Sequence, residues 1–233
     1  MTRAPSQAQH PRPAVAVDLV VFTILDADLK VLLVRRGEPP FTGSLALPGG
    51  FVRVGPTHDE QGEDVDAAAA RELAEETGLP AGSVFLEQLY TFGDAGRDPR
   101  GRVITVAYFA LVRPTLAPLV RAGGDAAEAG WRSLAELEQE RLAFDHRQIL
   151  DLALGRIRGK LDYTDIAFAL VPDAFTVAEL RAVHEVIQGK SYDPGNFRRR
   201  FLRMQTDGVL TRAPGRRATG ARPASVYRFR GRR

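Results

Sequence analysis

The chain has 233 residues, of which 44% are apolar and 26% charged, a globular composition that excludes a wholly disordered protein. It contains no cysteine, which excludes disulfides, thiolate metal sites and cysteine nucleophiles. No apolar run approaches the ~20 residues that cross a bilayer, so no membrane partner is expected. Residues 1–13 are polar and lack the apolar stretch of a secretory signal; they are interpreted as a mobile tail of a cytoplasmic protein.

The net charge of +3 conceals an asymmetry along the chain. Residues 1–144 carry 14 Arg/Lys and 20 Asp/Glu, a net −6, whereas residues 145–233 carry 18 and 9, a net +9. Residues 196–233 hold 12 arginines against one acid, Asp207. This polarity indicates two domains, 14–144 and 145–233, the second with a polyanion as its partner. The alternative is a solubilising basic tail.

The first domain is predicted to contain strands wherever apolar runs lie between turn-forming residues. These runs are 14–25, 29–34, 84–91, 103–112 and 129–133. Residues 64–77 predict a helix, because four consecutive alanines favour it, Asp64 and Asp66 suit its positive N-terminus, and Gly78 followed by Pro80 ends it. Strands around an inserted helix indicate an α/β (α+β) layer fold.

Three carboxylates, those of Glu72, Glu75 and Glu76, share one face of this helix at spacings i, i+3 and i+4. Hard oxygen ligands of this kind suit Mg²⁺ or Mn²⁺. Arg71 is placed to pair with one carboxylate and hold its orientation. Without further context, an acidic helical stripe is usually a solvated surface.

The surrounding sequence resembles the Nudix box, G-x5-E-x7-R-E-U-x-E-E-x-G-U, in which U is aliphatic. Glu63, seven residues and then RELAEETGL at 71–79 match every fixed position of its latter part. Twelve residues instead of five separate Gly50 from Glu63, so 56–62 are interpreted as a seven-residue insertion. Two effects are considered for it: displacement of Gly50, and competition of Glu60 with Glu63.

The resemblance implies a Nudix fold, a mixed sheet between helices, that hydrolyses nucleoside diphosphates linked to another moiety. It implies that the carbonyl of Gly50 and the side chains of Glu72, Glu75 and Glu76 bind the metal. The catalytic residues would be Arg71 and the same three glutamates, with the identity of the general base open. The metal ion neutralises the pyrophosphate and lowers the pKa of an attacking water.

Two further segments, 86–102 and RLAFDH at 141–146, resemble the Nudix branch that handles ADP-ribose. On the glycine-rich loop 93–102, arginine forks suit phosphate and an aspartate suits a ribose hydroxyl. The alternative is that these Asp/Arg pairs only stabilise their own turn. Related sequences often have Trp at the position of Leu45, so a stacking surface is expected to be missing there. The candidate substrate-binding residues are Arg36, Arg97, Asp98, Arg100 and Arg102.

The second domain has the element order of a winged helix-turn-helix, whose last helix lies in the major groove of DNA. Thr176 and Glu179 form a capping box for its second helix, and Phe197, Phe201 and Leu202 are expected to hold the last helix on the core. The predicted elements are helices at 145–160, 177–187 and 196–206, a link at 162–171, and strands at 209–212 and 226–230 around a loop at 213–225.

Polar side chains of the last helix and of the hairpin are the candidates for DNA contact, to base edges, phosphates or the minor groove. The alternative is a dimerisation module with its arginines on a solvated face. The candidate DNA-binding residues are Asn196, Arg198, Arg199, Arg200, Arg203, Arg216, Arg217 and Arg222.

The two parts together resemble the Nudix-related transcriptional regulators of NAD metabolism, which pair an ADP-ribose-sensing Nudix domain with a winged helix and act as dimers. FTVAEL at 175–180 and NFRR at 196–199 carry the C-terminal part of the resemblance. It implies a homodimer that binds ADP-ribose or a related nucleotide and a double-stranded DNA operator. Because this chain keeps box glutamates that many regulators of the group have lost, magnesium-dependent hydrolysis of ADP-ribose is also expected to be possible. The alternative is an ADP-ribose pyrophosphatase whose C-terminal domain serves dimerisation.

Overall fold

A computed structural model of the chain describes residues 12–55, 62–120, 128–218, 220 and 222–231. Within these ranges seven strands form one mixed sheet, in the order β3-β2-β1-β6-β5, with β4 also paired to β1 and β7 to β2. β1 and β6 are parallel, and the other pairs are antiparallel. The strands are β1 (Ala14–Leu25), β2 (Asp28–Arg35), β3 (Leu45–Ala46), β4 (Gly49–Phe51), β5 (Phe85–Phe92), β6 (Val103–Leu111) and β7 (Glu128–Ser133).

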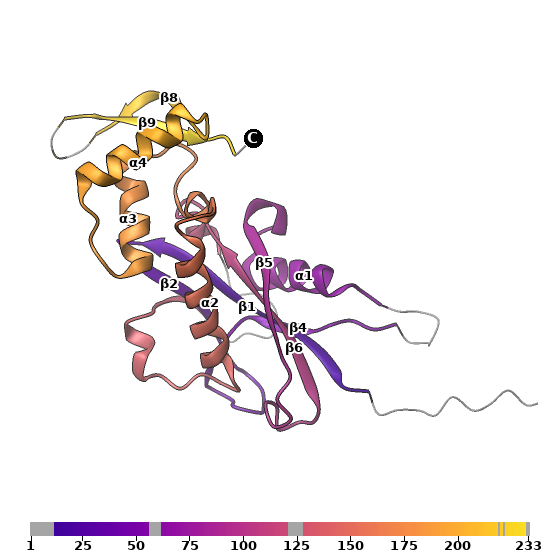
Figure 1. The fold of residues 1–233 in the computed structure, drawn as a ribbon. Coiled ribbons are helices and arrows are strands. Elements are labelled where there is room, and N and C mark those ends of the chain that lie inside the picture. Colours follow the sequence, from indigo (N-terminus) through magenta and orange to yellow (C-terminus); the bar gives the residue numbers. More distant parts are fainter. Residues whose placement is uncertain (1–11, 56–61, 121–127, 219, 221, 232–233) are drawn as a thin grey trace, which may run out of the picture.

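The sheet lies between two helices, α1 (Val65–Thr77) and α2 (His146–Lys160) (Figure 1). β1 shows why, because its side chains alternate and both of its faces are buried. Val17, Leu19 and Val21 pack in the cluster that contains the buried face of α1. Val20 and Phe22 pack in the cluster that contains the buried face of α2. The predicted strands are confirmed within one or two residues, whereas the short β3 and β4 were not predicted.

The helix that carries the three carboxylates begins and ends where the sequence indicates. Asp64 is the residue before its first turn, and Gly78 follows it with a left-handed φ of 70°, its amide donating to the carbonyl of Ala74 at 2.8 Å. Short 3₁₀ helices lie in the connections: η1 (Ala81–Ser83), η2 (Ala117–Leu119), η3 (Glu136–Gln139) and η4 (Ile166–Leu170).

The position of α2 bears on the boundary between the two domains. Ile149, Leu150, Ala153 and Ile157 are buried on its inner face, in one cluster with residues of β1, β2 and β6. The side chain of Arg156 donates to the carbonyl of Leu89 on β5 at 3.0 Å. The helix therefore covers the sheet of the first domain. A boundary after residue 144 stays a prediction, and this packing favours one after Lys160.

The C-terminal domain has the predicted winged helix order (Figure 1). The capping box is confirmed, because the Thr176 hydroxyl accepts from the amide of Glu179 and the Glu179 carboxylate accepts from the amide of Thr176. β9 also pairs with the segment before the second helix, through two hydrogen bonds between Phe175 and Tyr227. The elements are α3 (Val177–Gln188), α4 (Pro194–Thr206), β8 (Leu210–Arg217) and β9 (Ala224–Phe229).

Two expectations for this domain are wrong. Phe197 and Phe201 are buried, but the side chain of Leu202 is 44% exposed, because a residue five positions after Phe197 has turned past the buried stripe. The strands of the wing are also longer than predicted, so much of the expected loop at 213–225 is strand. A register shift between Arg212 and Arg216 absorbs Pro214 and Gly215 within β8, which the sequence pattern had placed in a loop.

His184 is a buried, neutral histidine of the winged helix domain. It is 2% exposed, its ring lies against those of Phe197 and Tyr192, and its Nδ1 has no hydrogen-bond partner among the described residues. Burial, and then the charge of Arg200, lower its pKa to about 4. Since an unfolded histidine has a pKa near 6.5, the unfolded state binds more protons between these values and stability falls as the pH drops.

We expect this histidine to cost the protein about 2 kcal/mol of unfolding free energy between pH 7 and pH 5. Urea unfolding of the wild type and of His184→Leu at both pH values measures the contribution, because the variant lacks the titrating group. The variant should lose less stability on acidification than the wild type does. Equal losses in the two proteins would show that His184 is not protonated on unfolding.

Candidate functional site

The guanidinium of Arg71 lies at the centre of the carboxylates of α1 and its preceding loop. Its Nη2 is 2.6 Å and its Nε 3.0 Å from the two carboxylate oxygens of Glu63, in a bidentate pair. Its Nη1 donates to Glu72 Oε1 at 2.7 Å and to Glu75 Oε2 at 2.9 Å. One cation thus holds three carboxylates, which is how clustered like charges are tolerated here.

These contacts set the protonation of Glu63. Hydrogen bonds from the Arg71 side chain, and then from the backbone amide of Arg53, lower the pKa of Glu63 to about 2. The same carboxylates raise the pKa of Arg71. The stabilisation that comes from ionised Glu63 is therefore present above its ordinary pKa of about 4.5 and is lost as the pH falls toward 2.

The two ends of the loop that contains the insertion are hydrogen-bonded to each other beside the box. The amide of Arg53 donates to Glu63 Oε1 at 2.8 Å, and the amide of Glu63 donates to the carbonyl of Arg53 at 3.0 Å. Gly50 pairs with Val17 in the β1–β4 ladder and faces Glu72, whose Oε1 lies 2.2 Å from where a Gly50 Cβ would be. Gly50 and Glu63 therefore both keep their places beside the helix. Glu60 lies outside the described residues.

The donors of this cluster suit a hard divalent cation, although arginine occupies them here. Glu72, Glu75 and Glu76 offer carboxylate oxygens, and the Glu72 carboxylate lies close to the α-carbon of Gly50. Glu75 also pairs with Arg53 at 3.0 Å. Among the described residues no three acidic or histidine side chains converge as a ready metal site. The chemistry of the donors therefore fits the ion, and Arg71 holds Glu72 and Glu75 in place.

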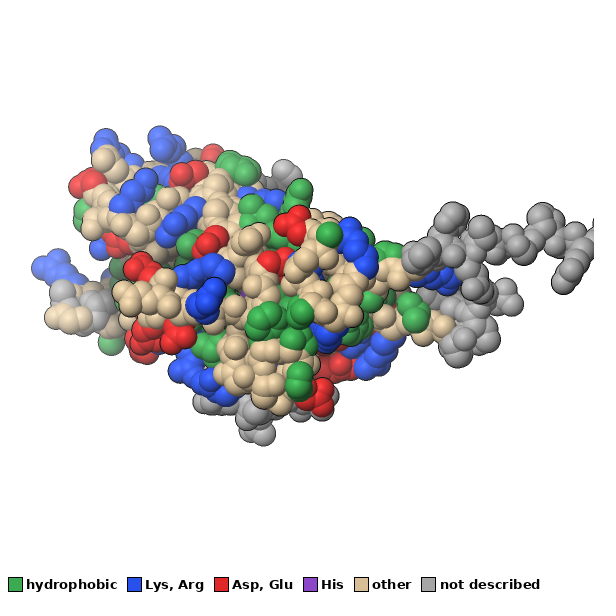
Figure 2. All heavy atoms as spheres, turned by 90° about the horizontal axis from the view of Figure 1, so that it is seen from below, with side chains coloured by type: hydrophobic (Ala, Val, Ile, Leu, Met, Phe, Trp, Pro, Cys, Tyr) green, Lys and Arg blue, Asp and Glu red, His purple; other side chains and the backbone are tan. Residues whose placement is uncertain are grey.

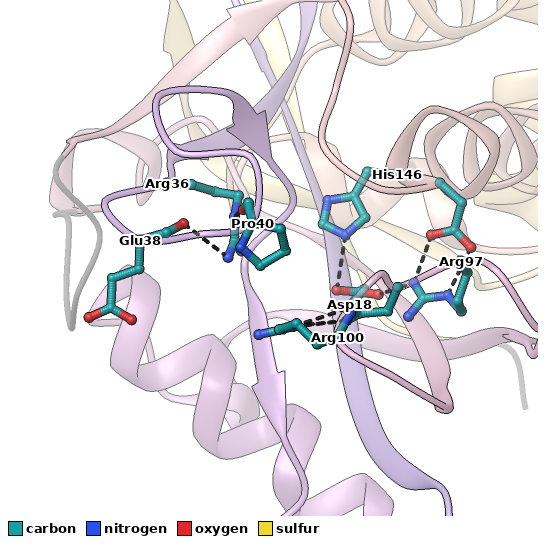
Figure 3. A network of polar contacts seen from close by, with 9 residues as sticks. Asp18, Arg36, Glu38, Pro40, Arg97, Arg100 and His146 are labelled. Atoms are coloured by element: carbon teal, nitrogen blue, oxygen red, sulfur yellow. Dashed lines mark hydrogen bonds and ion pairs between the residues drawn. The ribbon is translucent and has the colours of Figure 1, made fainter.

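A pocket of about 210 Å³ opens beside the box, between β1, β4, the loop 93–102 and the start of α2. Its walls combine arginines, acids and aromatic rings with the backbone of Gly49 and Gly50. Asp18, on β1, lies deep in it, and both His146 and Arg97 point at its carboxylate (Figure 3). The lining is the kind that suits a small polar ligand with an anionic group.

Arg97 is the most buried cation of this pocket. Its side chain is 4% exposed, donates to both carboxylate oxygens of Asp145 at 2.7 and 2.8 Å, and reaches Asp18 Oδ2 at 3.2 Å. Against the cost of burial, these carboxylates raise the pKa of Arg97. Its fork is thus directed at protein carboxylates, and direct contact of Arg97 with a phosphate stays a prediction.

His146 joins the same network at the first residue of α2. Its Nδ1 accepts from the amide of Leu47 at 2.9 Å, so Nε2 carries the proton and faces Asp18 Oδ1 at 3.5 Å. Burial lowers the pKa of His146, which keeps the ring neutral. Sequence reasoning gave no role to Asp18, Asp145 or His146. Two signals were available: the segment RLAFDH at 141–146, which contains Asp145 and His146, and a single acid, Asp18, inside the apolar run 14–25.

The other predicted substrate-binding residues lie at the pocket or near it. Asp98 forms a bidentate pair with Arg100, with Nη2 2.7 Å from Oδ2, and this pairing lowers the pKa of Asp98. Arg36 lies in the pocket wall and donates to the carbonyls of Pro40 and Glu38 (Figure 3). Arg102 donates to the carbonyl of Gly93 at 2.6 Å and does not line the pocket. The structure thus brings Arg36, Asp98 and Arg100 together.

An aromatic surface lies in the pocket although Leu45 carries none. Phe144 is part of the lining and adopts a left-handed φ of 52°, an uncommon conformation for a residue with a side chain. The guanidinium carbons of Arg36 and Arg100 lie 4.9 and 5.5 Å from the centre of its ring, and Phe41 meets it edge-on. Phe144 belongs to the segment RLAFDH at 141–146, but it was not among the predicted substrate-binding residues.

The predicted DNA-binding side chains of α4 divide into two groups. Asn196, Arg198, Arg199 and Arg203 are exposed. Arg200 is half-buried, and its Nη1 and Nη2 donate to the side chain and the carbonyl of Asp162 at 2.9 and 3.1 Å.

On the wing, Arg216 and Arg222 are exposed, whereas Arg217 binds Glu179 and the carbonyl of Ala174. On the face seen from below, basic side chains are interspersed with acidic ones (Figure 2), so the described residues there create no single-sign field.

Comparison with known proteins gives the same two parts. The model of the NUDIX domain matches residues 14–153, and that of the NrtR DNA-binding winged helix domain matches residues 167–229. The ADPR responsive transcriptional repressor NtrR of Acinetobacter baylyi is 35% identical over 223 residues, 96% of this chain and 84% of that protein. The ADP-ribose pyrophosphatase of Methanocaldococcus jannaschii is 42% identical over 138 residues, 59% of this chain and 71% of that protein.

A solved structure agrees with these matches over nearly the whole chain. The crystal structure of Shewanella oneidensis NrtR complexed with a 27mer DNA has a TM-score of 0.79 and 36% identity to this chain and covers 93% of each. The expected fold class, a mixed-sheet domain followed by a winged helix, is therefore confirmed. No helix among the described residues is both long and apolar enough to cross a membrane.

The close approach of Gly50 to Glu72 can be tested by adding one methyl group. We expect Gly50→Ala to lower the unfolding free energy by about 1–3 kcal/mol, because the new Cβ displaces a buried carboxylate that Arg71 holds. Urea unfolding measures the change. Gly130→Ala on β7 is the matched control, since nothing lies within 4 Å of its Cβ position. A Gly50→Ala protein as stable as the control would show that Glu72 is free to move.

Proposed function

This chain belongs to the Nudix family, among members that carry an NrtR-type winged helix domain. From that premise we propose that it is a DNA-binding repressor of NAD metabolism that senses ADP-ribose or a closely related nucleotide. One observation carries the proposal. A cationic pocket lined by aromatic rings and the exposed arginines of α4 belong to domains that share one continuous hydrophobic cluster. The first binds a nucleotide and the second binds DNA.

The pocket has the groups that a nucleotide diphosphate needs. Burial, and then the nearby charge of Arg100, lower the pKa of Arg36, so two like charges stand close together at the pocket. A phosphate between them would relieve that repulsion and accept hydrogen bonds from both forks. The ring of Phe144, which both guanidinium groups face, offers a surface for stacking. Arg36 and Arg100 are thus the proposed phosphate ligands, and Arg97 holds the pocket in shape.

The exposed side chains of α4 are the proposed readers of the major groove. Asn196, Arg198 and Arg199 lie in its first two turns, which is the part of a recognition helix that contacts base edges. Arg203, Arg216 and Arg222 would contact phosphates. A homodimer is proposed with this arrangement, because two such helices one helical turn of DNA apart would match a palindromic operator.

Hydrolysis of ADP-ribose is a second proposed activity, favoured by the retained glutamates of the box and by the similarity to a pyrophosphatase. A divalent ion, Mg²⁺ or Mn²⁺, would be held by Glu72, Glu75, Glu76 and the carbonyl of Gly50. When bound, it would neutralise diphosphate charge and activate a water. Arg71 orients the glutamates. The alternative of a pyrophosphatase without DNA binding fits the exposed arginines of α4 less well.

The repressor reading predicts DNA binding that depends on salt and on the nucleotide. The protein should bind upstream DNA of NAD-biosynthesis operons, and its association constant should fall as the salt concentration rises. For each phosphate neutralised, a tenfold increase in salt should lower the logarithm of that constant by about 0.9. ADP-ribose should weaken it further. Fluorescence anisotropy with a labelled duplex measures both effects, with a scrambled duplex as the control. Absence of binding at low salt would end the proposal.

The enzymatic reading predicts that Glu75→Gln loses metal-dependent turnover of ADP-ribose to AMP and ribose 5-phosphate. The substitution removes one carboxylate charge next to Arg71 and Arg53 and leaves the shape of the side chain unchanged. We expect the turnover rate to fall by about 10²-fold or more. Chromatography of the products measures this rate. Glu136→Gln, on the exposed surface of η3, is the matched control. Turnover unchanged in Glu75→Gln would place catalysis elsewhere.

A further inference from the structure

The N-terminal end of α2 forms part of the nucleotide pocket. Asp145, directly before the helix, accepts two hydrogen bonds from the Arg97 fork, and the ring of His146, its first residue, accepts one from the amide of Leu47. Arg97, His146 and Leu47 all line the pocket. Any ligand that moves the loop 93–102 or the strand before Gly49 therefore acts on the first turn of α2.

The helix is built to transmit such a displacement as a rigid rod. It has 15 residues, about 22 Å at 1.5 Å per residue. Its inner face is fully buried, with Ile149, Ala153 and Ile157 at 0% exposure. The hydrophobic cluster that contains this face runs on without a break into α3 and α4, through residues such as Val183 and Phe201. Close-packed interiors pass on shifts because they are hard to compress.

The C-terminal end of α2 is fastened to the winged helix domain. The side chain of Arg158 donates to the carbonyl of Ile187 at 2.9 Å, and the side chain of Gln188 donates back to the carbonyl of Arg158 at 3.0 Å. These reciprocal bonds join the last turns of α2 and α3. Just beyond α2, Asp162 takes both hydrogen bonds of Arg200. The recognition helix is thus tied directly to the segment that leaves α2.

Two surface pockets lie beside the contacts between the end of α2 and the winged helix domain, which are called the joint below. A cavity of about 460 Å³ lies on one side, between α2, α3 and the β1–β2 turn, with Leu154 and Val186 in its wall. Another, of about 450 Å³, lies between β5, the end of α2 and η4, with Lys160 and Phe168 in its wall. Open pockets therefore flank the contacts between α2 and the winged helix domain on two sides.

We propose that α2 carries the state of the nucleotide pocket to the recognition helix, and that the pair Asp162–Arg200 is the contact through which α4 receives it. In this assignment Arg200 is a positioning residue of α4 and not a DNA contact, in contrast to its neighbours Arg198 and Arg199. The inference rests on the proposed function, because it requires a protein that binds both a nucleotide and DNA.

The physical requirement is that the nucleotide and DNA favour different positions of α2. A ligand shifts an equilibrium only by its difference in affinity for the two states. The joint contacts must therefore be made in one state and changed in the other. Weakening them should let α4 move independently of α2, and so reduce the factor by which one ligand changes the affinity for the other.

The test compares Asp162→Ala and Gln188→Ala with the wild type. Calorimetry measures ADP-ribose affinity without DNA, and anisotropy measures DNA affinity with and without saturating ADP-ribose. We expect both variants to bind ADP-ribose within about twofold of the wild type. The factor by which ADP-ribose weakens DNA binding, typically about 5- to 150-fold in allosteric proteins, should fall at least fivefold or to no effect.

Asp151→Ala, an exposed aspartate of α2 with the same charge change, is the matched control and should keep the wild-type factor. Arg203→Met, which removes a proposed phosphate contact on the exposed surface of α4, should lower the salt dependence of DNA binding by about one phosphate and keep the factor. Melting temperatures verify that every variant folds. The inference is overturned if Asp162→Ala and Gln188→Ala respond to ADP-ribose as the wild type does. If the wild type itself does not respond, the proposed function fails instead.

Discussion

A buried guanidinium, that of Arg97, is the constraint on which the pocket and its surroundings depend. Its side chain is 4% exposed, and such a charge is tolerated only with its carboxylate partners, since breaking a buried pair typically costs about 3–5 kcal/mol. Asp18 comes from the centre of the sheet and Asp145 from the start of α2. The interaction therefore fixes the loop 93–102 against the strand and the helix together, and the pocket cannot be deformed without acting on α2.

At the Nudix box, a second arginine pairs with several carboxylates, but here the pairs lie near the surface. Arg71 faces three carboxylates near the surface, where each pair alone would contribute little. Their value lies in holding the side chains ready in one place. The insertion before Glu63 is compatible with this, because the hydrogen bonds between Arg53 and Glu63 close the loop at its base. These two hydrogen bonds hold the Glu63 carboxylate beside Arg71 without any contribution from the insertion.

Much of the fold and of the box could be predicted, because both depend on neighbours in sequence. The capping box at Thr176, the helix stop at Gly78 and the carboxylate spacing on α1 are local features, and the structure confirms them. The polar contacts of the pocket could not be predicted, because they join residues far apart: Arg97 and Asp18 are separated by 79 positions, and Leu47 and His146 by 99. Leu202 was misassigned because it follows Phe197 by five positions, which carries its side chain past the buried stripe of α4.

The arginines of the C-terminal domain show why charge alone does not define a DNA-binding surface. Composition treats Arg198, Arg199 and Arg200 as equivalent, yet only the first two are exposed, and the third faces Asp162. On the wing, Arg216 is exposed while Arg217 is bound to Glu179 of α3. Each inward arginine ties one element of the winged helix to another part of the molecule. The positive charge of this domain thus serves two ends, contact with a polyanion and the orientation of the elements that make it.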